Sequence, residues 1–333
     1  MDANSVIQNL KKGIYHPIYL LQGEEPYYIN EISSWIEKNV LTEAERGFNQ
    51  TIFYGKDSDA ITIAESAMRF PMMADKQVII VKEAQTLNKI ETLISYAEKP
   101  LASTILVLNY KYKKLRANTK LAKAIKKNGL VFTSDKVRDY QLPKWVEGYL
   151  REREFSITPQ AVQILTAYLG TNLSKVANEL DKLIIAIKDT NKITPEHIEK
   201  NIGISKDFNI FELQNALGEK NIFKANQIIN YFGANDKQNP IQATTAMLYS
   251  YFSKIFKFHF LKDKSERNAA AKLGVNPFFV KDYIAAARKY SPTKLYEIIG
   301  ILREYDMKSK GFGVSGLVST ADLQKEMIYK ILH

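Results

Sequence analysis

The chain contains no cysteine among its 333 residues. Disulfides, thiolate zinc sites and thiol nucleophiles are therefore excluded. The four histidines, His16, His197, His259 and His333, lie far apart in the sequence and form no pair with metal-ligand spacing. No apolar run approaches the roughly 20 residues that a membrane-spanning helix needs, and the N-terminal stretch lacks a small-residue cleavage site. We expect a cytoplasmic protein without a metal site and without a membrane partner.

A phosphate-binding loop is also missing from the place where many nucleotide-binding folds have one. Residues Ile18–Ile32, IYLLQGEEPYYINEI, have the pattern of a short strand, a glycine and a helix start. A Walker loop places glycine, lysine and a hydroxyl residue at the helix start, because backbone amides, the lysine and the hydroxyl hold the phosphates and Mg²⁺. After Gly23, this chain has Ile29, Asn30 and Glu31 there.

Two further nucleotide-contact residues are missing. The strand VIIV ends in Lys82, where a nucleotidase carries an acidic residue that holds magnesium. Ser174 stands at the start of a later helix where such enzymes often carry an arginine that reaches the γ-phosphate. We therefore expect a degenerate nucleotide site at Gly23, Asn30, Glu31, Lys82 and Ser174, with no ATPase activity, no cofactor and no catalytic residue.

The first part of the chain alternates strands with amphipathic helices, which predicts a mainly parallel α/β layer. The predicted strands are Ile18–Leu21, Gln50–Tyr54, Gln77–Val81, Thr104–Leu108 and Leu130–Thr133. The predicted helices between them are Tyr27–Asn39, Ala60–Arg69, Lys89–Ala97 and Thr119–Asn128.

From Asp139 onward, strand signals stop and helix signals take over. Thr158 and Thr194, each followed by proline, and Asn172 are typical N-caps, and Pro240 precedes a long aromatic-rich helix. The predicted domains are 1–140, an α/β core, 141–206, a small helical lid, and 207–333, an all-α domain.

Six segments follow one another along the chain: YLLQGEEPYYINE, FPMMADKQVIIVKEA, LGTNLSKVANELDKL, FNIFELQNALGEKN, AAAKLGVNPFFVK and DLQKEMIYKIL. In this order they resemble the delta subunits of the bacterial DNA polymerase III clamp loader, a family of AAA+ proteins without ATPase function. It spans nearly the whole chain. It implies a RecA-like AAA+ core, a helical lid and a helical collar that joins a ring of related subunits.

The resemblance assigns the working surface to the segment RFPMMADKQ, Arg69–Gln77. In the family, two large apolar residues here enter an apolar pocket of the ring-shaped sliding clamp. The matching positions are Met72 and Met73, with Phe70 beside them, whereas the family more often has leucine and phenylalanine. Methionine is flexible and still fits an apolar pocket. From the residues alone, ordinary helix-end core is an alternative reading.

A basic run between Glu98 and Asp135 is the second candidate site. It contains no acidic residue and includes Lys111, Lys113, Lys114, Arg116, Lys120, Lys123, Lys126 and Lys127. With a net charge of +11, the chain favours a polyanionic partner, and such a run suits contact with DNA phosphates. A solvated helix face and contact with an acidic protein are the alternatives.

Phe312, between two glycines and behind two lysines, is the third candidate. A ring on such a loop can stack on bases, and the resemblance implies an aromatic near this position at the primer–template junction. Packing of the ring against the neighbouring helix is the alternative.

The resemblance implies a delta subunit that binds the sliding clamp (beta subunit) and traps one open ring interface, so that the ATP-driven loader can place the clamp on primed DNA. The implied partners are the clamp, the ATPase subunits (gamma and tau), delta-prime and primed DNA. The chain would be a non-catalytic subunit of the polymerase holoenzyme. An active AAA+ ATPase with an unorthodox site and a DNA-binding adaptor without clamp contact are the alternatives.

Overall fold

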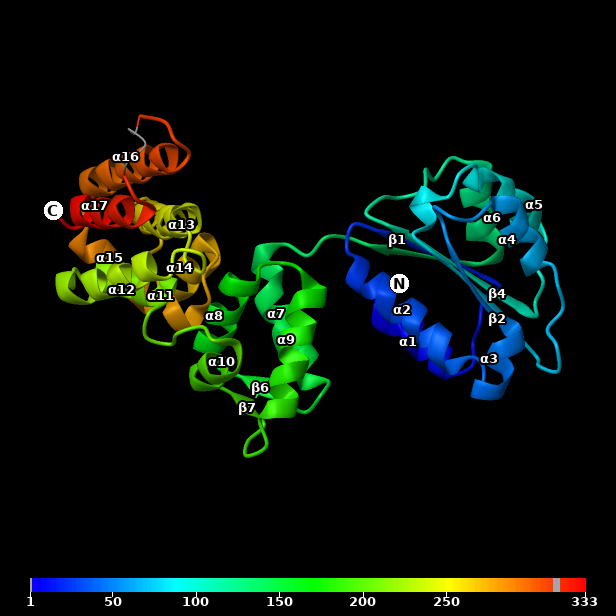
Figure 1. Cartoon of the computed structure of the whole chain (residues 1–333). Helices are drawn as coiled ribbons and strands as arrows, with labels where there is room; N and C mark the ends of the chain where they lie inside the picture. Colours follow the sequence, from blue (N-terminus) through cyan, green and yellow to red (C-terminus); the bar gives the residue numbers. More distant parts are fainter. Residues whose placement is uncertain (1, 314–317) are drawn as a thin grey trace. The chain divides into compact units, whose positions relative to one another are not determined.

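The computed structural model describes residues 2–313 and 318–333 (Figure 1). It divides into two compact units, Met1–Arg138 and Asp139–His333. The predicted division of the second unit into a lid and a collar at residue 206 stays a prediction.

The first unit is built on a parallel five-stranded sheet with the order β2-β3-β4-β1-β5. In the register of the sheet, Leu20 of β1 lies between Leu108 of β4 and Val131 of β5. Each strand lies where the sequence predicted one: β1 Ile18–Gly23, β2 Gln50–Tyr54, β3 Gln77–Lys82, β4 Thr104–Lys111 and β5 Leu130–Ser134. The predicted parallel α/β fold of this unit is confirmed.

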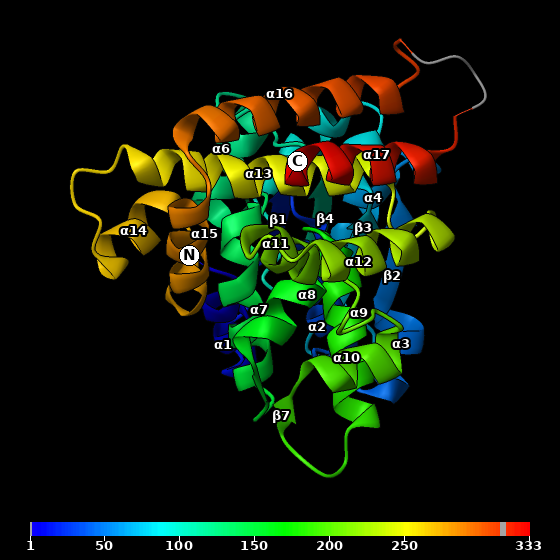
Figure 2. The same cartoon turned by 90° about the vertical axis from the view of Figure 1, so that its left-hand side faces the viewer.

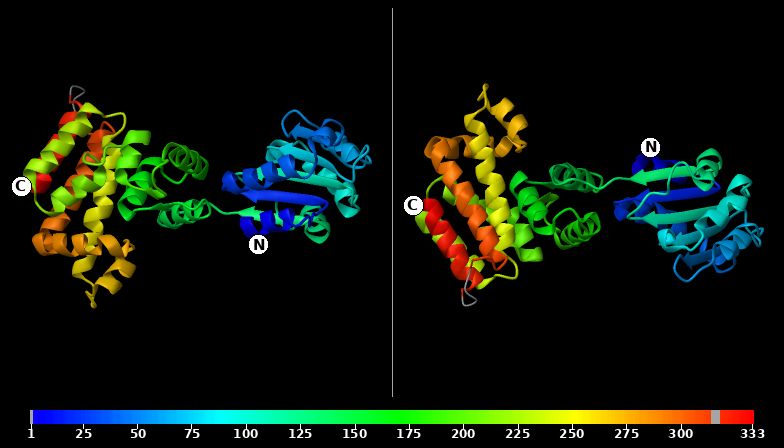
Figure 3. Two further views of the ribbon diagram at one scale, coloured as in Figure 1. Left: turned by 90° about the horizontal axis from the view of Figure 1, so that it is seen from below. Right: turned by 90° about the horizontal axis from the view of Figure 1, so that it is seen from above.

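Helices cover both faces of this sheet (Figures 1 and 3). Because side chains alternate along a strand, Tyr19 and Leu21 share one core with helices α1 and α2, whereas Ile18 and Leu20 share the other with α4, α5 and α6. The helices of this unit are α1 Ala3–Lys11, α2 Pro26–Asn39, α3 Glu43–Asn49, α4 Ala60–Ala67, α5 Ile94–Glu98 and α6 Lys120–Asn128.

Three local features of this unit differ from the sequence prediction. Helices α1 and α3 were not predicted, and the predicted helix Lys89–Ala97 is α-helical only in its second half. Its first half is the 3₁₀ turn η2, Ile90–Leu93, and Lys89 before this turn has a left-handed backbone with φ +50°, outside the α-helical range. A second 3₁₀ turn, η1, spans Ala84–Thr86.

The second unit begins with helices whose starts the sequence predicted. Thr158, Asn172 and Thr194 are the N-caps of α8 Pro159–Leu169, α9 Leu173–Ala186 and α10 Pro195–Ile202. They follow η3 Asp139–Gln141 and α7 Leu142–Arg151. The expectation that strands stop at Asp139 was wrong, because β6 Ser156–Ile157 and β7 Lys192–Ile193 form a short parallel pair.

The remaining helices enclose a core of their own, in which α13 packs against α16 and α17 (Figure 2). Tyr251, Phe252 and Ile255 of α13 are buried in this core, so the aromatic stripe after Pro240 is structural. The elements are α11 Ile210–Gly218, α12 Ile222–Ala234, α13 Ile241–His259, α14 Glu266–Leu273, η4 Pro277–Phe279, α15 Val280–Lys289, α16 Pro292–Ser309 and α17 Thr320–Leu332. In the described part of the chain, every helix is too short or too polar to span a bilayer.

Candidate functional site

An exposed apolar turn connects α4 to β3. We call residues Phe70, Pro71, Met72 and Met73 the 70–73 turn. The side chains of Phe70, Met72 and Met73 are 77%, 62% and 102% exposed. This exposure excludes the alternative that the three residues are helix-end core, and it leaves an apolar surface that a partner could cover.

Buried polar side chains hold the backbone around this turn. The amide of Gln77 donates hydrogen bonds to the backbone oxygen of Arg69 and, over 2.7 Å, to the hydroxyl of Thr104. That hydroxyl donates to the backbone oxygen of Ala67 over 2.9 Å. On the other side, the side-chain amide of Asn49 bonds both backbone polar groups of Met72. Sequence reasoning missed Asn49, Gln77 and Thr104, because single polar residues at a helix end or a strand start give no recognisable signal.

The predicted nucleotide edge lies at the opposite end of the sheet. Parallel strands end at one edge, which carries Gly23 of β1 and Lys82 of β3. The 70–73 turn precedes β3, so the two candidate sites are separated by the length of that strand, roughly 16 Å at 3.3 Å per residue.

The backbone amides of the loop after β1 are already hydrogen-bonded within the chain. The N–H of Gly23 donates to the backbone oxygen of Lys113 over 3.0 Å. The N–H groups of Glu24 and Glu25 both donate to the backbone oxygen of Ser134, over 2.9 and 3.4 Å. The first three amides of the loop are therefore not available to a phosphate.

The carboxylate of Glu25 takes the position at the start of α2 where an anion would be expected. It is the N-cap and accepts a hydrogen bond from the N–H of Tyr27 over 3.0 Å. Burial raises the pKa of Glu25, and the hydrogen bond from Tyr27 and the charge of Lys136 oppose this shift. The carboxylate therefore occupies the N-terminus of the helix in place of a bound anion.

The Walker motif requires one correction to the predicted positions. When its first glycine is placed on Gly23, the lysine falls on Ile29 and the hydroxyl residue on Asn30, rather than on Asn30 and Glu31. Ile29 is fully buried in the core, whereas Asn30 and Glu31 are exposed on α2. Either placement lacks the phosphate-binding lysine.

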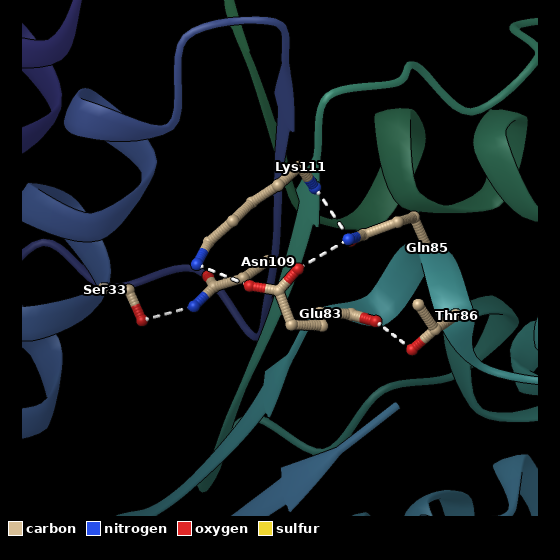
Figure 4. A network of polar contacts seen from close by, with 6 residues as sticks. All are labelled: Ser33, Glu83, Gln85, Thr86, Asn109 and Lys111. Atoms are coloured by element: carbon tan, nitrogen blue, oxygen red, sulfur yellow. Dashed lines mark hydrogen bonds and ion pairs between the residues drawn. The ribbon is translucent and has the colours of Figure 1, made fainter. Parts of the chain in front are cut away.

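Polar side chains form a network of contacts at the C-terminal ends of β3 and β4 (Figure 4). The carboxylate of Glu83 accepts from the ammonium of Lys111 over 2.7 Å and from the amide of Gln85 over 2.6 Å. Burial alone would raise the pKa of Glu83, but the hydrogen bonds from Lys111 and Gln85 outweigh burial and lower it. On β4, the amide of Asn109 donates to the hydroxyl of Ser33 over 2.8 Å.

The two remaining residues of the predicted nucleotide site, Lys82 and Ser174, lie in different parts of the fold. The ammonium of Lys82 lies 3.4 Å from the carboxylate of Glu37 on α2. Ser174 lies half-buried in the first turn of α9, in the second unit. With its first three loop amides paired, no lysine at the Walker position and a lysine at the magnesium position, this edge does not fit ATP with Mg²⁺. The described residues also contain no group of three or more acidic or histidine side chains arranged to hold a metal ion.

The basic run begins at the same edge of the sheet, between β4 and α6. Lys111 is largely withdrawn from solvent by its bond to Glu83, with a side chain only 15% exposed, and Lys114 pairs with Asp135 over 2.7 Å. Lys113, Arg116 and Lys120 are exposed. The surface that remains for a polyanion includes these three residues, and Lys123, Lys126 and Lys127 of α6 are exposed as well.

Phe312 lies in a turn after α16, in the second unit. Gly311 and Gly313, on either side of it, have left-handed backbones with φ +89° and +71°. The ring is 63% exposed, so it is not packed against the neighbouring helix.

Comparison with known proteins gives one consistent result. A model of the DNA polymerase III delta subunit matches residues 19–134, and a model of the C-terminal domain of that subunit matches residues 207–315. The DNA polymerase III subunit delta of Bacillus subtilis (strain 168) is 27% identical over 318 residues, which cover 91% of each chain. The probable DNA polymerase III subunit delta of Aquifex aeolicus (strain VF5) is 22% identical over 311 residues, with 88% of this chain and 86% of the relative covered.

A solved structure shares the fold. The Bacillus subtilis DNA clamp loader delta protein superposes with a TM-score of 0.55 and 24% identity, and 99% of each chain is covered. The likeness therefore extends through both compact units.

Proposed function

Since the chain belongs to the family of DNA polymerase III delta subunits, we propose that it binds a ring-shaped sliding clamp through the 70–73 turn. In this proposal, Met72 and Met73 enter an apolar pocket of the clamp, and Phe70 packs at the pocket's rim. The occupied pocket then favours a clamp with one ring interface open. The rest of the loader places that clamp on primed DNA.

The observation that carries this proposal is the exposure of three large apolar side chains on a turn fixed by buried polar groups. An apolar side chain that passes from solvent into a pocket gains about 1.5–3 kcal/mol. A turn whose backbone is already fixed loses little further conformational entropy when it binds. Together these properties favour a protein partner with a small, deep apolar pocket.

The chain's own contribution is mechanical rather than catalytic. Because the nucleotide edge does not fit ATP, the energy for assembly and release would come from ATP bound to the ATPase subunits, gamma and tau. The partners would be these subunits, delta-prime and the clamp (beta subunit). The exposed residues Lys113, Arg116 and Lys120, with Phe312 in the second unit, would contact DNA within the complex.

An active AAA+ ATPase is the second candidate function. Isothermal titration with ATP and Mg²⁺ distinguishes the two, because specific binding would contradict a loop whose amides are already paired. A DNA-binding adaptor is the third candidate, and clamp binding by the isolated chain would count against it.

The test of the proposal is clamp binding by the double variant Met72→Ala/Met73→Ala. Removal of both side chains should cost about 3 kcal/mol or more, which weakens clamp binding at least about 100-fold. Because both side chains are exposed, the free energy of unfolding should change by no more than about 0.5 kcal/mol. Titration calorimetry and urea denaturation measure the two quantities.

The matched control replaces two other exposed apolar residues of the same unit, Ile14 and Ile61, which are 50% and 53% exposed. The variant Ile14→Ala/Ile61→Ala should bind the clamp as the original chain does. Equal clamp affinities of the original chain and the Met72→Ala/Met73→Ala variant would refute the proposal.

A further inference from the structure

Helix α3 contacts the 70–73 turn through one buried side chain. Asn49, the last residue of α3, is 4% exposed. Its carbonyl oxygen Oδ1 accepts a hydrogen bond from the N–H of Met72 over 2.6 Å. Its Nδ2 donates to the backbone oxygen of Met72 over 2.9 Å and to that of Glu45, within α3, over 3.1 Å. The side chain thus joins both backbone polar groups of Met72 to the helix.

The turn has few other means of holding its shape. Nine residues, 68–76, separate α4 from β3, and the side chains of Phe70, Met72 and Met73 are too exposed to anchor the backbone by packing. Met73 also has a left-handed backbone with φ +51°, which is uncommon for a residue other than glycine. Such a conformation persists only when its surroundings impose it.

The anchors on the two sides of the turn divide this role. Gln77 holds the backbone oxygen of Arg69, before the turn. After the turn, the ammonium of Lys76 donates to the backbone oxygen of Ala102 over 2.7 Å. Among the contacts of the described residues, those of Asn49 reach the backbone of Met72 itself, one residue before the left-handed position. Without Asn49, the centre of the turn would be free to rearrange.

We propose that Asn49 is a positioning residue for partner binding, which holds the Met72–Met73 backbone in its binding conformation before the clamp arrives. This inference rests on the proposed function. Its role is energetic: the apparent dissociation constant equals the intrinsic one divided by the fraction of chains in the competent conformation. Asn49 would keep that fraction close to one.

The test replaces Asn49 by alanine and measures two quantities on the full chain. Hydrogen exchange of the Met72 amide should accelerate at least about tenfold, because its acceptor is removed. Clamp binding, measured with the purified clamp, should weaken about tenfold if the competent fraction falls to about one in ten. Amides of β1 and β4 should keep their protection, which shows that the sheet is intact.

Two further variants make the test specific. Asn49→Asp keeps an acceptor for the Met72 N–H but removes the donor to the Met72 backbone oxygen. The exchange rate of the Met72 amide and the clamp affinity of this variant should therefore lie between those of the original chain and Asn49→Ala. If the amides of β1 and β4 lose their protection in Asn49→Ala, Asn49→Asp takes its place as the test variant. Asn39→Ala is the matched control, because the Asn39 side chain also bonds the backbone oxygen four residues earlier, Trp35, over 2.8 Å but lies on α2. It should leave both quantities unchanged.

The outcomes separate the inference from the proposed function. If the original chain binds the clamp and Asn49→Ala binds it equally well, the positioning role is wrong and the clamp contact stands. Unchanged exchange at Met72 would overturn the inference as well. Failure of the original chain to bind the clamp would overturn both.

Discussion

Gly23 occupies the place of a phosphate-binding glycine, but the neighbouring strand explains why glycine is needed there. Its φ is +129°, and a Cβ atom would lie 1.9 Å from the backbone oxygen of Ser134 on β5. The residue therefore permits close packing of β1 against β5 and the hydrogen bonds from Glu24 and Glu25 to Ser134.

The variant Gly23→Ala should accordingly lower the free energy of unfolding by about 3 kcal/mol, from backbone strain and overpacking. Urea denaturation measures this change. Gly47→Ala is the control, because nothing lies within 4 Å of a Cβ placed on Gly47 in α3. That variant should be neutral or more stable by up to about 1 kcal/mol. A Gly23→Ala chain as stable as the original would contradict the structural role.

The outcome at the 70–73 turn shows what residue patterns leave undecided. Phe70, Met72 and Met73 are apolar residues of the kind that a buried helix end also contains. The sequence therefore left open whether they form a binding surface or part of the core. Only the fold shows that neighbouring elements leave these side chains in solvent while Asn49 and Gln77 occupy the interior. The anchors themselves gave no signal, because partners such as Met72 for Asn49 and Thr104 for Gln77 are distant in sequence.

At the level of elements, α6 carries lysines at both of its ends, and their effects on helix stability differ. Its buried residues Leu121, Ala122 and Ile125 face the core. Lys126 and Lys127 lie in the last turn, where positive charge interacts favourably with the helix dipole and stabilises the helix. Lys120 stands at the first helical position, where a cation is unfavourable by about 0.3–1 kcal/mol. Helix stability thus accounts for Lys126 and Lys127 but not for Lys120.

We therefore expect DNA binding to depend on the residues before and at the start of α6. Reversal of charge at Lys113, Arg116 and Lys120 should reduce the slope of log K against log salt by about 0.9 for each phosphate that is no longer neutralised. Fluorescence anisotropy with a primed duplex at several salt concentrations measures the slope. Charge reversal at Lys11, Lys12 and Lys38, exposed elsewhere in the unit, should leave it nearly unchanged. The same slope in both triple variants would argue for a solvated helix face instead.

The helices and strands also show which elements local sequence patterns can predict. Strand runs bounded by polar turns and caps such as Thr158 and Asn172 predicted most elements of both units, because these signals act within a few residues. The 3₁₀ turn Ile90–Leu93 and the β6–β7 pair escaped prediction. The first follows a residue with a left-handed backbone, Lys89, and the second depends on pairing between Ser156–Ile157 and Lys192–Ile193, far apart in the chain.

For the whole molecule, the two compact units have separate cores and meet in sequence after Arg138. Residues 135–138, between β5 and η3, contain Lys136 and Arg138, both exposed. Limited trypsin digestion should therefore cut first at these residues and leave two protected fragments, which mass spectrometry identifies. A following cut at Lys206 would support the predicted division into lid and collar. Earlier cuts inside either unit would contradict independent cores.

The sequence by itself determined the parallel α/β core, the helical remainder, the family and the loss of the phosphate-binding lysine. The core and the helical remainder follow from local periodicity and caps, and the lost lysine follows from the residues of a short motif. The family follows from the resemblance of several segments in their order along the chain. Only the tertiary structure decided that the 70–73 turn is exposed and that Asn49 holds it. It also decided that the loop amides after Gly23 are paired with Lys113 and Ser134. Exposure and backbone pairing depend on segments that meet only after the chain has folded, so no short stretch of sequence can specify them.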